Sequence, residues 1–352
     1  MTPAPVPASR LRQEIHEQPS VLERLLRSQG TAADRLAAAV RSADVTHVVI
    51  AARGTSDNAG RYAQYVLGAM NGLVVALATP SLFTSYDRPP RFRHALVLGI
   101  SQSGRSPDII AVLAEAKRQG ALTAVLTNDV SSELAAQADV ILDLCAGEEK
   151  AVAATKTYTA ELAAIALLSS RMKADAEMAE ALARLPEAVS KALQEHDAVE
   201  RAATRLQTIR YAAVIGRGFN YASAFELALK IKELAYISAD AYSSADFRHG
   251  PLALVEAEYP VILIGAAGPL MADMRALAGT LRERRAAVVW ISDDPDTTLS
   301  SEASIFLPPT VPEWLTPVSL IVPGQLLAMR MAELRGLDVD RPRSISKVTE
   351  TY

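Results

Sequence analysis

The segment ALVLGISQSGRS, residues 95–106, decides how the rest of the chain is interpreted. Its first six residues are aliphatic or small, which is typical of a buried strand. The loop that follows is rich in hydroxyl groups, and residues 107–119 then show a helical pattern. A strand, a polar loop and a helix in this order form the unit from which parallel sheets are built. Ligands bind such sheets beyond the carboxyl ends of the strands, so this loop is a candidate site.

The same unit recurs along the chain. We expect strands in the first half at 47–52, 95–100, 123–127 and 140–144, and in the second half at 212–216, 261–265, 287–291 and 304–307. Most of these runs end near a turn-forming residue, and helical patterns lie between them. The sequence therefore predicts an α/β fold in which crossover helices flank a mainly parallel sheet.

The spacing of the strand ends indicates an internal repeat. The matching pairs are Gly54 with Gly218, Gly99 with Gly265, Asn128 with Asp293, and Ala138 with Ala303, at separations of 164, 166, 165 and 165 residues. One nearly constant shift favours two copies of one α/β subdomain. Two unrelated α/β domains of similar size are the alternative.

The expected organisation has four parts. They are a lead-in with a first helix at 1–40, a first subdomain at 41–190, a second subdomain at 191–334 and a C-terminal tail at 335–352. Residues 1–8 are rich in Pro and Ala and are expected to be a disordered lead-in. Residues 176–208 show helical spacing and are expected to connect the two copies. The polar tail is either disordered or a closing loop that carries function.

Composition and charge exclude several classes of protein. The 352 residues include 36 Lys and Arg against 40 Asp and Glu, and the net charge of −4 gives no support for a nucleic-acid or acidic-membrane partner. Cys145 is the only cysteine, which excludes an intramolecular disulfide and a cysteine-clustered metal site. No apolar run is as long as the about 18 residues that a bilayer span needs. We therefore expect a cytoplasmic protein.

Two hydroxyl-rich loops follow the first two expected strands. Residues 53–58 include Thr55 and Ser56, and residues 101–106 include Ser101, Gln102, Ser103 and Ser106. Each loop leads into a helix, and a helix N-terminus with free amides suits a phosphate group. Helix capping alone explains one serine in each loop, but three serines and a glutamine exceed that need. No G-x-G-x-x-G or G-x-x-x-x-G-K-[ST] motif is present, so we expect no nucleotide cofactor.

A second candidate site lies in the second half. Glu226, Lys230 and Glu233 are spaced to share one face of a probable helix that is otherwise largely apolar. The three charges form either the thin solvated face of that helix or a partly buried site in which a glutamate acts as a general base. His249 follows in a turn sequence and is either structural or catalytic. The histidines show no ligand spacing, so no metal site is expected.

With these motifs assembled, the chain resembles the sugar isomerase (SIS) domain family. It is most similar to the tandem-SIS isomerase half of glucosamine-6-phosphate synthase and to stand-alone aminosugar-phosphate deaminases. The resemblance covers residues 12–347 and is carried by the segments 14–19, 53–58, 101–106, 149–156, 216–218, 229–233, 248–251, 338–343 and Lys347. It implies two tandem subdomains, each a doubly wound, flavodoxin-like sheet.

The resemblance also implies a role for individual residues. Glu233 matches the base that moves a proton between C1 and C2, and Lys230 matches a supporting lysine on the same helix. His249 matches the ring-opening histidine that reaches into the partner subunit's site, which implies a homodimer. Lys347 matches the lysine that meets the open-chain carbonyl. The implied substrate contacts are Thr55, Ser56, Ser101, Gln102, Ser103, Ser106, Glu149 and Val152.

The implied activity is that of an aminosugar-phosphate deaminase, which converts glucosamine 6-phosphate to fructose 6-phosphate and ammonia. The synthase's glutaminase domain has no counterpart in this sequence, so we expect no glutamine hydrolysis. An ammonia-dependent or plain aldose–ketose phosphosugar isomerase, or a deaminase of galactosamine phosphate or a fructosamine phosphate, is the alternative within this chemistry. A non-catalytic sugar-phosphate sensor is the alternative from another class. Arg53, beside the first loop, departs from the synthase pattern, which has a small residue there.

Overall fold

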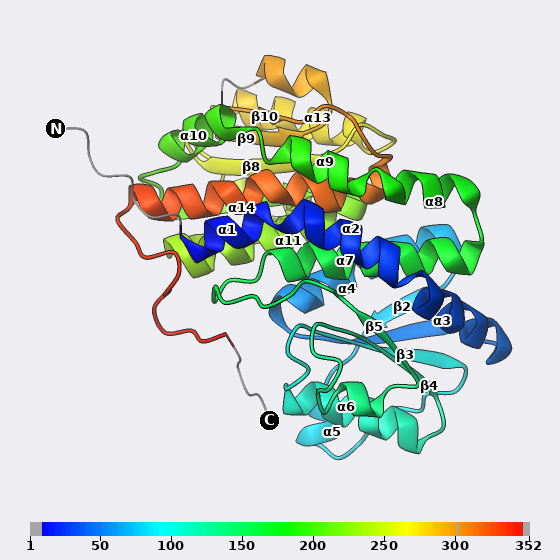
Figure 1. Cartoon of the computed structure of the whole chain (residues 1–352). Helices are drawn as coiled ribbons and strands as arrows, with labels where there is room; N and C mark the ends of the chain where they lie inside the picture. The colour runs from blue at the N-terminus through cyan, green and yellow to red at the C-terminus, as the bar shows by residue number, and fades with distance from the viewer. Residues whose placement is uncertain (1–8, 301–302, 348–352) are drawn as a thin grey trace.

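Two sheets form the frame of the molecule (Figure 1). The computed structural model describes residues 9–300 and 303–347, and within them each sheet has five parallel strands. The strands are β1 His47–Ala51, β2 Val74–Leu77, β3 Ala95–Ser101, β4 Leu122–Thr127, β5 Val140–Asp143, β6 Tyr211–Gly216, β7 Ser238–Ser243, β8 Pro260–Gly265, β9 Ala287–Ser292 and β10 Ile305–Phe306. The sheet orders, β2-β1-β3-β4-β5 and β10-β9-β8-β6-β7, are the same order repeated. The predicted tandem, doubly wound α/β fold is confirmed.

Two strands were missing from the prediction, one in each sheet. Both β2 and β7 lie at a sheet edge, next to the first strand of their half. Val74 in β2 is 72% exposed, and β7 has the polar sequence SADAYS. An edge strand is buried on fewer sides than a central one, so its sequence has less need of a continuous apolar run. The hydrophobic pattern therefore revealed the three inner strands of each sheet and one of its two edge strands, β5 or β10, but not the other.

Helices fill the space between and outside the sheets. Those with α-helical geometry are α1 Arg10–His16, α2 Gln18–Ser28, α3 Gly30–Ser42, α4 Gly54–Asn71, α5 Ser81–Thr84, α6 Pro107–Arg118, α7 Lys156–Lys173, α8 Ala176–Ala183, α9 Leu185–Ala192, α10 His196–Arg205, α11 Tyr221–Lys230, α12 Ser244–Arg248, α13 Met271–Glu283 and α14 Thr316–Leu334. Three helices stand where one was expected before β1. The expected connection at 176–208 is also three helices, because Pro186 starts a new helix at α9. The expected lead-in at 1–8 lies outside the described residues.

The repeat seen in the sequence is also a repeat in backbone conformation. Arg53 and Arg217 are both extended, and the glycines that follow them, Gly54 and Gly218, have φ angles of +54° and +59°. These positive values favour glycine, because a side chain would clash with its own backbone. The first strand of each half thus turns into its next helix in the same way, which supports duplication over two unrelated domains.

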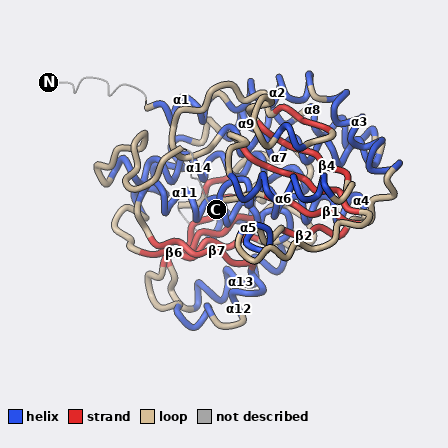
Figure 2. Tube along the Cα trace, turned by 90° about the horizontal axis from the view of Figure 1, so that it is seen from below, coloured by secondary structure: helices blue, strands red, loops and turns tan. Residues whose placement is uncertain are grey.

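One hydrophobic core is shared by the two halves. Ile50 of the first sheet and Ile262 of the second belong to the same buried cluster, which also takes in the helices between the sheets. Alternate residues face outward, so Val97 packs with α6 and Leu263 packs with α13 in separate clusters. Figures 1 and 2 show the resulting layers, with helices between the two sheets and on their outer faces. Both faces of each sheet are buried, as parallel sheets require.

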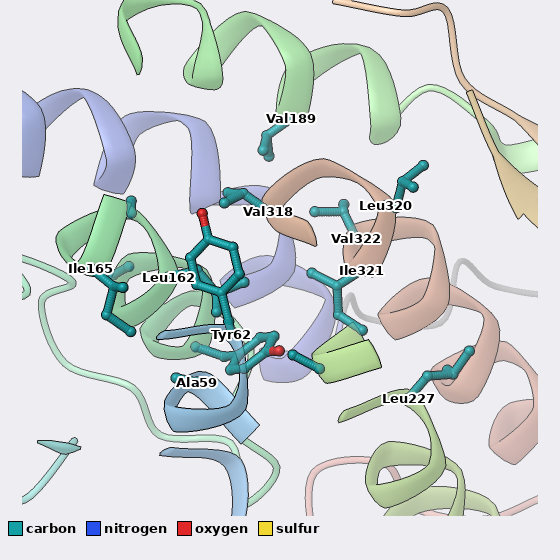
Figure 3. Packing of buried hydrophobic residues seen from close by; sticks show 14 of the residues in the cluster. Ala59, Tyr62, Leu162, Ile165, Val189, Leu227, Val318, Leu320, Ile321 and Val322 are labelled. Atoms are coloured by element: carbon teal, nitrogen blue, oxygen red, sulfur yellow. The ribbon is translucent and has the colours of Figure 1, made fainter. Parts of the chain in front are cut away.

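Helix α14 lies at the centre of this core (Figure 3). Its residues Val318 and Ile321 are fully buried, and they pack near Tyr62 of α4, whose hydroxyl donates to the Trp314 carbonyl at 2.8 Å. The segment Glu313–Leu334 is long and apolar enough to cross a membrane, but 94% of its most apolar window is buried inside the protein. Its apolar character is that of a core helix.

Polar groups cross the core where α4, α7 and α11 meet. Ser56 Oγ donates to Glu161 Oε1 at 2.7 Å, and Asn58 Nδ2 donates to Glu226 Oε2 at 2.9 Å. Both carboxyl groups are fully buried. Burial raises the pKa of Glu161 to about 8 against the opposing effect of the Ser56 hydrogen bond. Burial also raises the pKa of Glu226 to about 7, although Lys230 beside it acts in the other direction.

We expect Glu161→Gln to become more stable relative to the wild-type protein as the pH rises. An acid whose pKa is raised by folding keeps its proton in the folded state, so its contribution to stability is present at low pH and lost as the pH rises through about 8. Glutamine does not titrate, so this loss disappears. Urea unfolding at about pH 5 and about pH 8 should shift the difference in free energy of unfolding by about 2 kcal/mol in favour of the variant.

Glu180→Gln is the matched control, because Glu180 lies exposed on α8. Its pH profile should run parallel to that of the wild-type protein. A parallel profile for Glu161→Gln as well would contradict the prediction.

Candidate active site

The charged residues of the second half form a buried cluster rather than a solvated helix face. Lys230 ends α11, and its Nζ lies 3.3 Å from Glu226 Oε1 and 2.5 Å from Glu233 Oε2. The side chains of Glu226 and Lys230 are at most 1% exposed, whereas that of Glu233 is 22% exposed. Burial alone would lower the pKa of Lys230, but the two carboxylates outweigh it and raise that pKa. Lys230 is thus a fixed cation that holds one solvent-accessible carboxylate.

Glu233 lies on a widened turn that continues α11. Residues Ile231–Ala235 have π-helical geometry, which in proteins is rare and frequent at functional sites. The turn ends at Tyr236, whose φ of 55° is in the left-handed region. Glu233 therefore lies at the end of the helix, where its carboxylate combines a buried cation on one side with access from solvent on the other.

Thr55 joins this cluster from the other half of the chain. Lys230 Nζ donates to Thr55 Oγ1 at 3.2 Å, and Thr55 Oγ1 donates to Glu226 Oε1 at 3.1 Å. The predicted loop at 53–58 was too long, because α4 begins at Gly54 and includes Thr55 and Ser56 in its first turn. Both hydroxyls therefore donate to buried carboxylates rather than capping the helix, and their remaining lone pairs can accept a hydrogen bond.

The loop after β3 is tightly folded around its own backbone. Ser101 Oγ accepts from the Gly104 amide at 3.1 Å, and the Gln102 carbonyl accepts from the Asn128 amide at 3.2 Å. Gly104 has a φ of +62°, and a Cβ there would lie 2.1 Å from Ser132 Oγ, so no side chain fits. The loop brings its polar groups to the start of α6.

Ordinary helix capping does not account for this loop. Ser106 is the N-cap residue of α6, yet its side chain makes no capping hydrogen bond. Ser103 and Gln102 are partly exposed, and their side chains bond to no other described residue. These side chains therefore remain available to an anion at the start of α6.

The described part of the C-terminal tail, residues 335–347, crosses from the second half to the first (Figure 1). Asp340 accepts hydrogen bonds from the amides of Arg10 and Leu11, at 3.0 and 2.9 Å, which fixes the tail against α1. At its far end Lys347 Nζ lies 2.6 Å from Glu149 Oε2. Of the two readings of the tail, a closing loop fits these contacts.

Glu149 is held rigidly to receive that lysine. Its carboxylate accepts from the amides of Thr155 and Thr157, at 2.9 and 3.2 Å, and from the Thr157 hydroxyl at 2.8 Å. Burial alone would raise the pKa of Glu149, but Lys347 and these donors lower it. Val152 lies partly buried in the same loop, between Glu149 and α7.

The structure brings most of the predicted residues to one side of the first sheet, with one exception. His249 is exposed at the end of α12, and its side chain makes no hydrogen bond or ion pair with any described residue. No contact among the described residues links it to Glu233. In residues 9–300 and 303–347 no three His, Cys, Asp or Glu side chains are grouped to hold a metal ion.

Sequence reasoning missed several residues that shape the site. Asn58 and Glu161 lie on the buried side of Thr55 and Ser56, and Glu14 Oε1 accepts from the Lys150 amide at 2.5 Å beside Glu149. In the sequence, Glu14 was included only within the segment 14–19, one of the segments that carry the family resemblance, and was given no role of its own. Its helical neighbours are buried and apolar, so an acid at that position was the available signal that it serves a polar partner.

Comparison with known proteins agrees with this architecture. A family model of the SIS domain matches residues 42–171 and 206–332. The isomerizing glutamine–fructose-6-phosphate aminotransferase of Thermus thermophilus is 36% identical over 349 residues, which are 95% of this chain and 57% of that protein. This chain therefore spans little more than half the length of the curated relatives that it matches.

Solved structures extend the comparison. The C-terminal domain of glucosamine-fructose-6-phosphate aminotransferase from Francisella tularensis superposes with a TM-score of 0.86 at 27% identity, covering 95% of this chain and 98% of that one. Glucosamine-6-phosphate deaminase from Thermotoga maritima superposes with a TM-score of 0.78 and covers 97% and 100%, but its 19% identity shows the fold alone. Since the family model matches most of the chain in two segments, the chain belongs to the SIS domain family and carries that domain twice.

Proposed function

We propose that this protein is an enzyme that converts glucosamine 6-phosphate and water to fructose 6-phosphate and ammonia. The observation that carries the proposal is the partly exposed carboxylate of Glu233, which is held by the buried ammonium of Lys230 beside Thr55 at the carboxyl end of β1. A 1,2-proton transfer needs a carboxylate fixed next to the carbon that loses its proton. No other carboxylate of this cluster combines a fixed position with access from solvent.

The proposed reaction proceeds through the open-chain sugar. His249 opens the ring, and Glu233 then removes the proton from C2 and returns it to C1. With the loss of one proton from the nitrogen and the gain of one by the C1 oxygen, this step converts the C1 aldehyde to an alcohol and the C2 amine to an imine. Water adds to C2 and the C2–N bond breaks, which leaves the ketone of fructose 6-phosphate and releases ammonia. Lys347 hydrogen-bonds the C1 oxygen while the aldehyde is present.

The phosphate group sets the register of the substrate. We assign it to the start of α6, where the hydroxyl groups of Ser101, Ser103 and Ser106 and the amide group of Gln102 can donate to it. Thr55 and Ser56 then meet the sugar hydroxyls, and the loop that contains Glu149 and Val152 covers its other side. Binding energy from the phosphate aligns C1 and C2 with Glu233, although the phosphate itself does not react.

The relatives support an amino sugar as the substrate. The Thermus protein is named an isomerizing aminotransferase of fructose 6-phosphate, and the Francisella structure is the C-terminal domain of such a protein. The same interconversion with water as the second reactant, and without glutamine, releases ammonia. A plain aldose–ketose isomerase or a deaminase of a related phosphosugar uses the same groups, so substrate comparison is part of the test.

We expect the protein to release ammonia and fructose 6-phosphate in equal amounts from glucosamine 6-phosphate. Both products should be followed with coupled assays, without and with glutamine, and glutamine should make no difference. Ketose without ammonia from an ordinary aldose phosphate would instead identify a plain isomerase. Tight binding with neither product would identify a sensor.

We expect Glu233→Gln to abolish turnover but to leave phosphosugar affinity within about tenfold, or about 1.4 kcal/mol, of the wild-type value. Glutamine keeps the shape of the side chain but cannot accept the C2 proton. Turnover and the Kd for fructose 6-phosphate should both be measured. Glu256→Gln, at an exposed position of the second half, is the control and should retain activity. Loss of binding in Glu233→Gln would mean that Glu233 is structural.

The exposed position of His249 supports the proposal that it acts in the site of a partner subunit. His249→Ala and Glu233→Gln should each be inactive, and mixing the two after unfolding and refolding should restore about one quarter of wild-type activity. In a twofold dimer, half of the chains pair as mixed dimers, and each mixed dimer contains one intact site. No recovery from a mixture shown to contain mixed dimers would place His249 in its own subunit's site.

A further inference from the structure

Arg53 and Asp108 form an ion pair that joins the two loops of the first half. Arg53 Nε donates to Asp108 Oδ2 at 2.8 Å, and Nη2 lies 2.7 Å from the same oxygen. Arg53 directly precedes α4, and Asp108 is the second residue of α6. The pair therefore spans the crevice between β1 and β3, which is the switch point where sheets of this order bind ligands.

Asp108 is an unfavourable residue to place beside a phosphate. Its side chain is 2% exposed, and Oδ1 accepts only from the adjacent Ile109 amide at 2.9 Å. It thus sets a negative charge in the first turn of the helix that is proposed to hold the phosphate. Like charges in a partly desolvated crevice repel far more strongly than in water. A phosphate binds there well only if the Asp108 charge is cancelled, and Arg53 is the cation placed against it.

The second half contains the same pair in a different setting. Arg217 Nη1 lies 2.8 Å from Asp273 Oδ2, at positions 164 and 165 residues beyond Arg53 and Asp108. Asp273 has a further cation, since Arg248 Nη1 lies 2.9 Å from its Oδ1. The fold therefore repeats the pair, but only in the first half does the acid depend on one arginine.

The crevice of the second half is filled by the protein's own carboxylates. The Ala267 amide donates to Asp293 Oδ1 at 2.7 Å, and a Cβ at Gly268 would lie 2.7 Å from Glu313 Oε2. In the first half the residue equivalent to Asp293 is the neutral Asn128. In the second half the carboxylates of Asp293 and Glu313 occupy this crevice. In the first half the equivalent crevice can accept the phosphate of a ligand instead.

We propose that Arg53 is a positioning residue that selects for phosphorylated sugars by cancelling the charge of Asp108. Arg53 acts through Asp108 and need not touch the substrate. The inference rests on the proposed function, because it assumes that the phosphate binds at the start of α6. It assigns a role to a residue at which this chain departs from the synthase pattern.

The test compares Arg53→Ala, Asp108→Asn and the double variant by calorimetric titration with fructose 6-phosphate and with inorganic phosphate. Arg53→Ala should weaken both ligands at least about tenfold, because it leaves the Asp108 charge uncancelled. Asp108→Asn should bind at least as tightly as the wild-type protein. The double variant should return to within about threefold of the wild-type Kd, because no charge remains to be cancelled.

Arg217→Ala is the matched control, since it removes the equivalent arginine while Asp273 keeps Arg248. Its Kd for both ligands should be unchanged within about twofold. Thermal unfolding of every variant establishes that each is folded at the temperature of the titration.

Two outcomes would overturn this inference but leave the proposed function standing. One is a Kd for Arg53→Ala equal to that of the wild-type protein. The other is a double variant as weak as Arg53→Ala, because Arg53 would then act by direct contact or by holding the loops. A wild-type protein that binds neither phosphate nor fructose 6-phosphate would overturn the proposed function, and the inference with it.

Discussion

The buried ammonium group of Lys230 constrains the rest of the structure more than any other single group. A cation without solvent needs acceptors on every open side, and Lys230 has Glu226 and Glu233 from its own helix and Thr55 from α4. The two halves of the chain must therefore pack with α4 against α11. Asn58 donates to the other carboxylate oxygen of Glu226, Oε2. The buried charge of Lys230 therefore also fixes a polar residue deeper in the core. Glu233 is the member of this hydrogen-bonded cluster whose carboxylate reaches solvent.

Much of the fold follows from the sequence because parallel sheets are buried on both faces. Segments such as 95–100 and 261–265 must be continuously apolar, and their spacing reveals the duplication. Strands β2 and β7 escaped notice because neither is a buried apolar run: Val74 of β2 is exposed, and β7 has the polar sequence SADAYS. The loop residues Ser101 and Ser103 were predictable because a strand end is a local feature. The bond from Ser56 to Glu161 was not, since it joins residues 105 positions apart and depends on how three helices pack.

The two copies provide different groups to the candidate site. The first keeps an open loop at the start of α6, with side chains that bond to no other described residue. The second closes the equivalent loop with Asp293 and Glu313 and instead provides the helix that holds Glu226, Lys230 and Glu233. Neither half holds a complete set of groups. The tail adds Lys347 to the loop of the first half after passing the first helix, so the chain's two ends both support the site.

The shared core has a consequence for each copy taken alone. Each sheet turns one apolar face towards the same central helices, and α14 contacts elements from both halves. A chain cut between the copies would leave two fragments that each expose an inner sheet face to water, and such fragments associate or aggregate. A single copy on its own would need a partner molecule against that face. In this chain the second copy provides that cover, and the buried carboxylate of Glu226 at the junction makes each half dependent on side chains of the other.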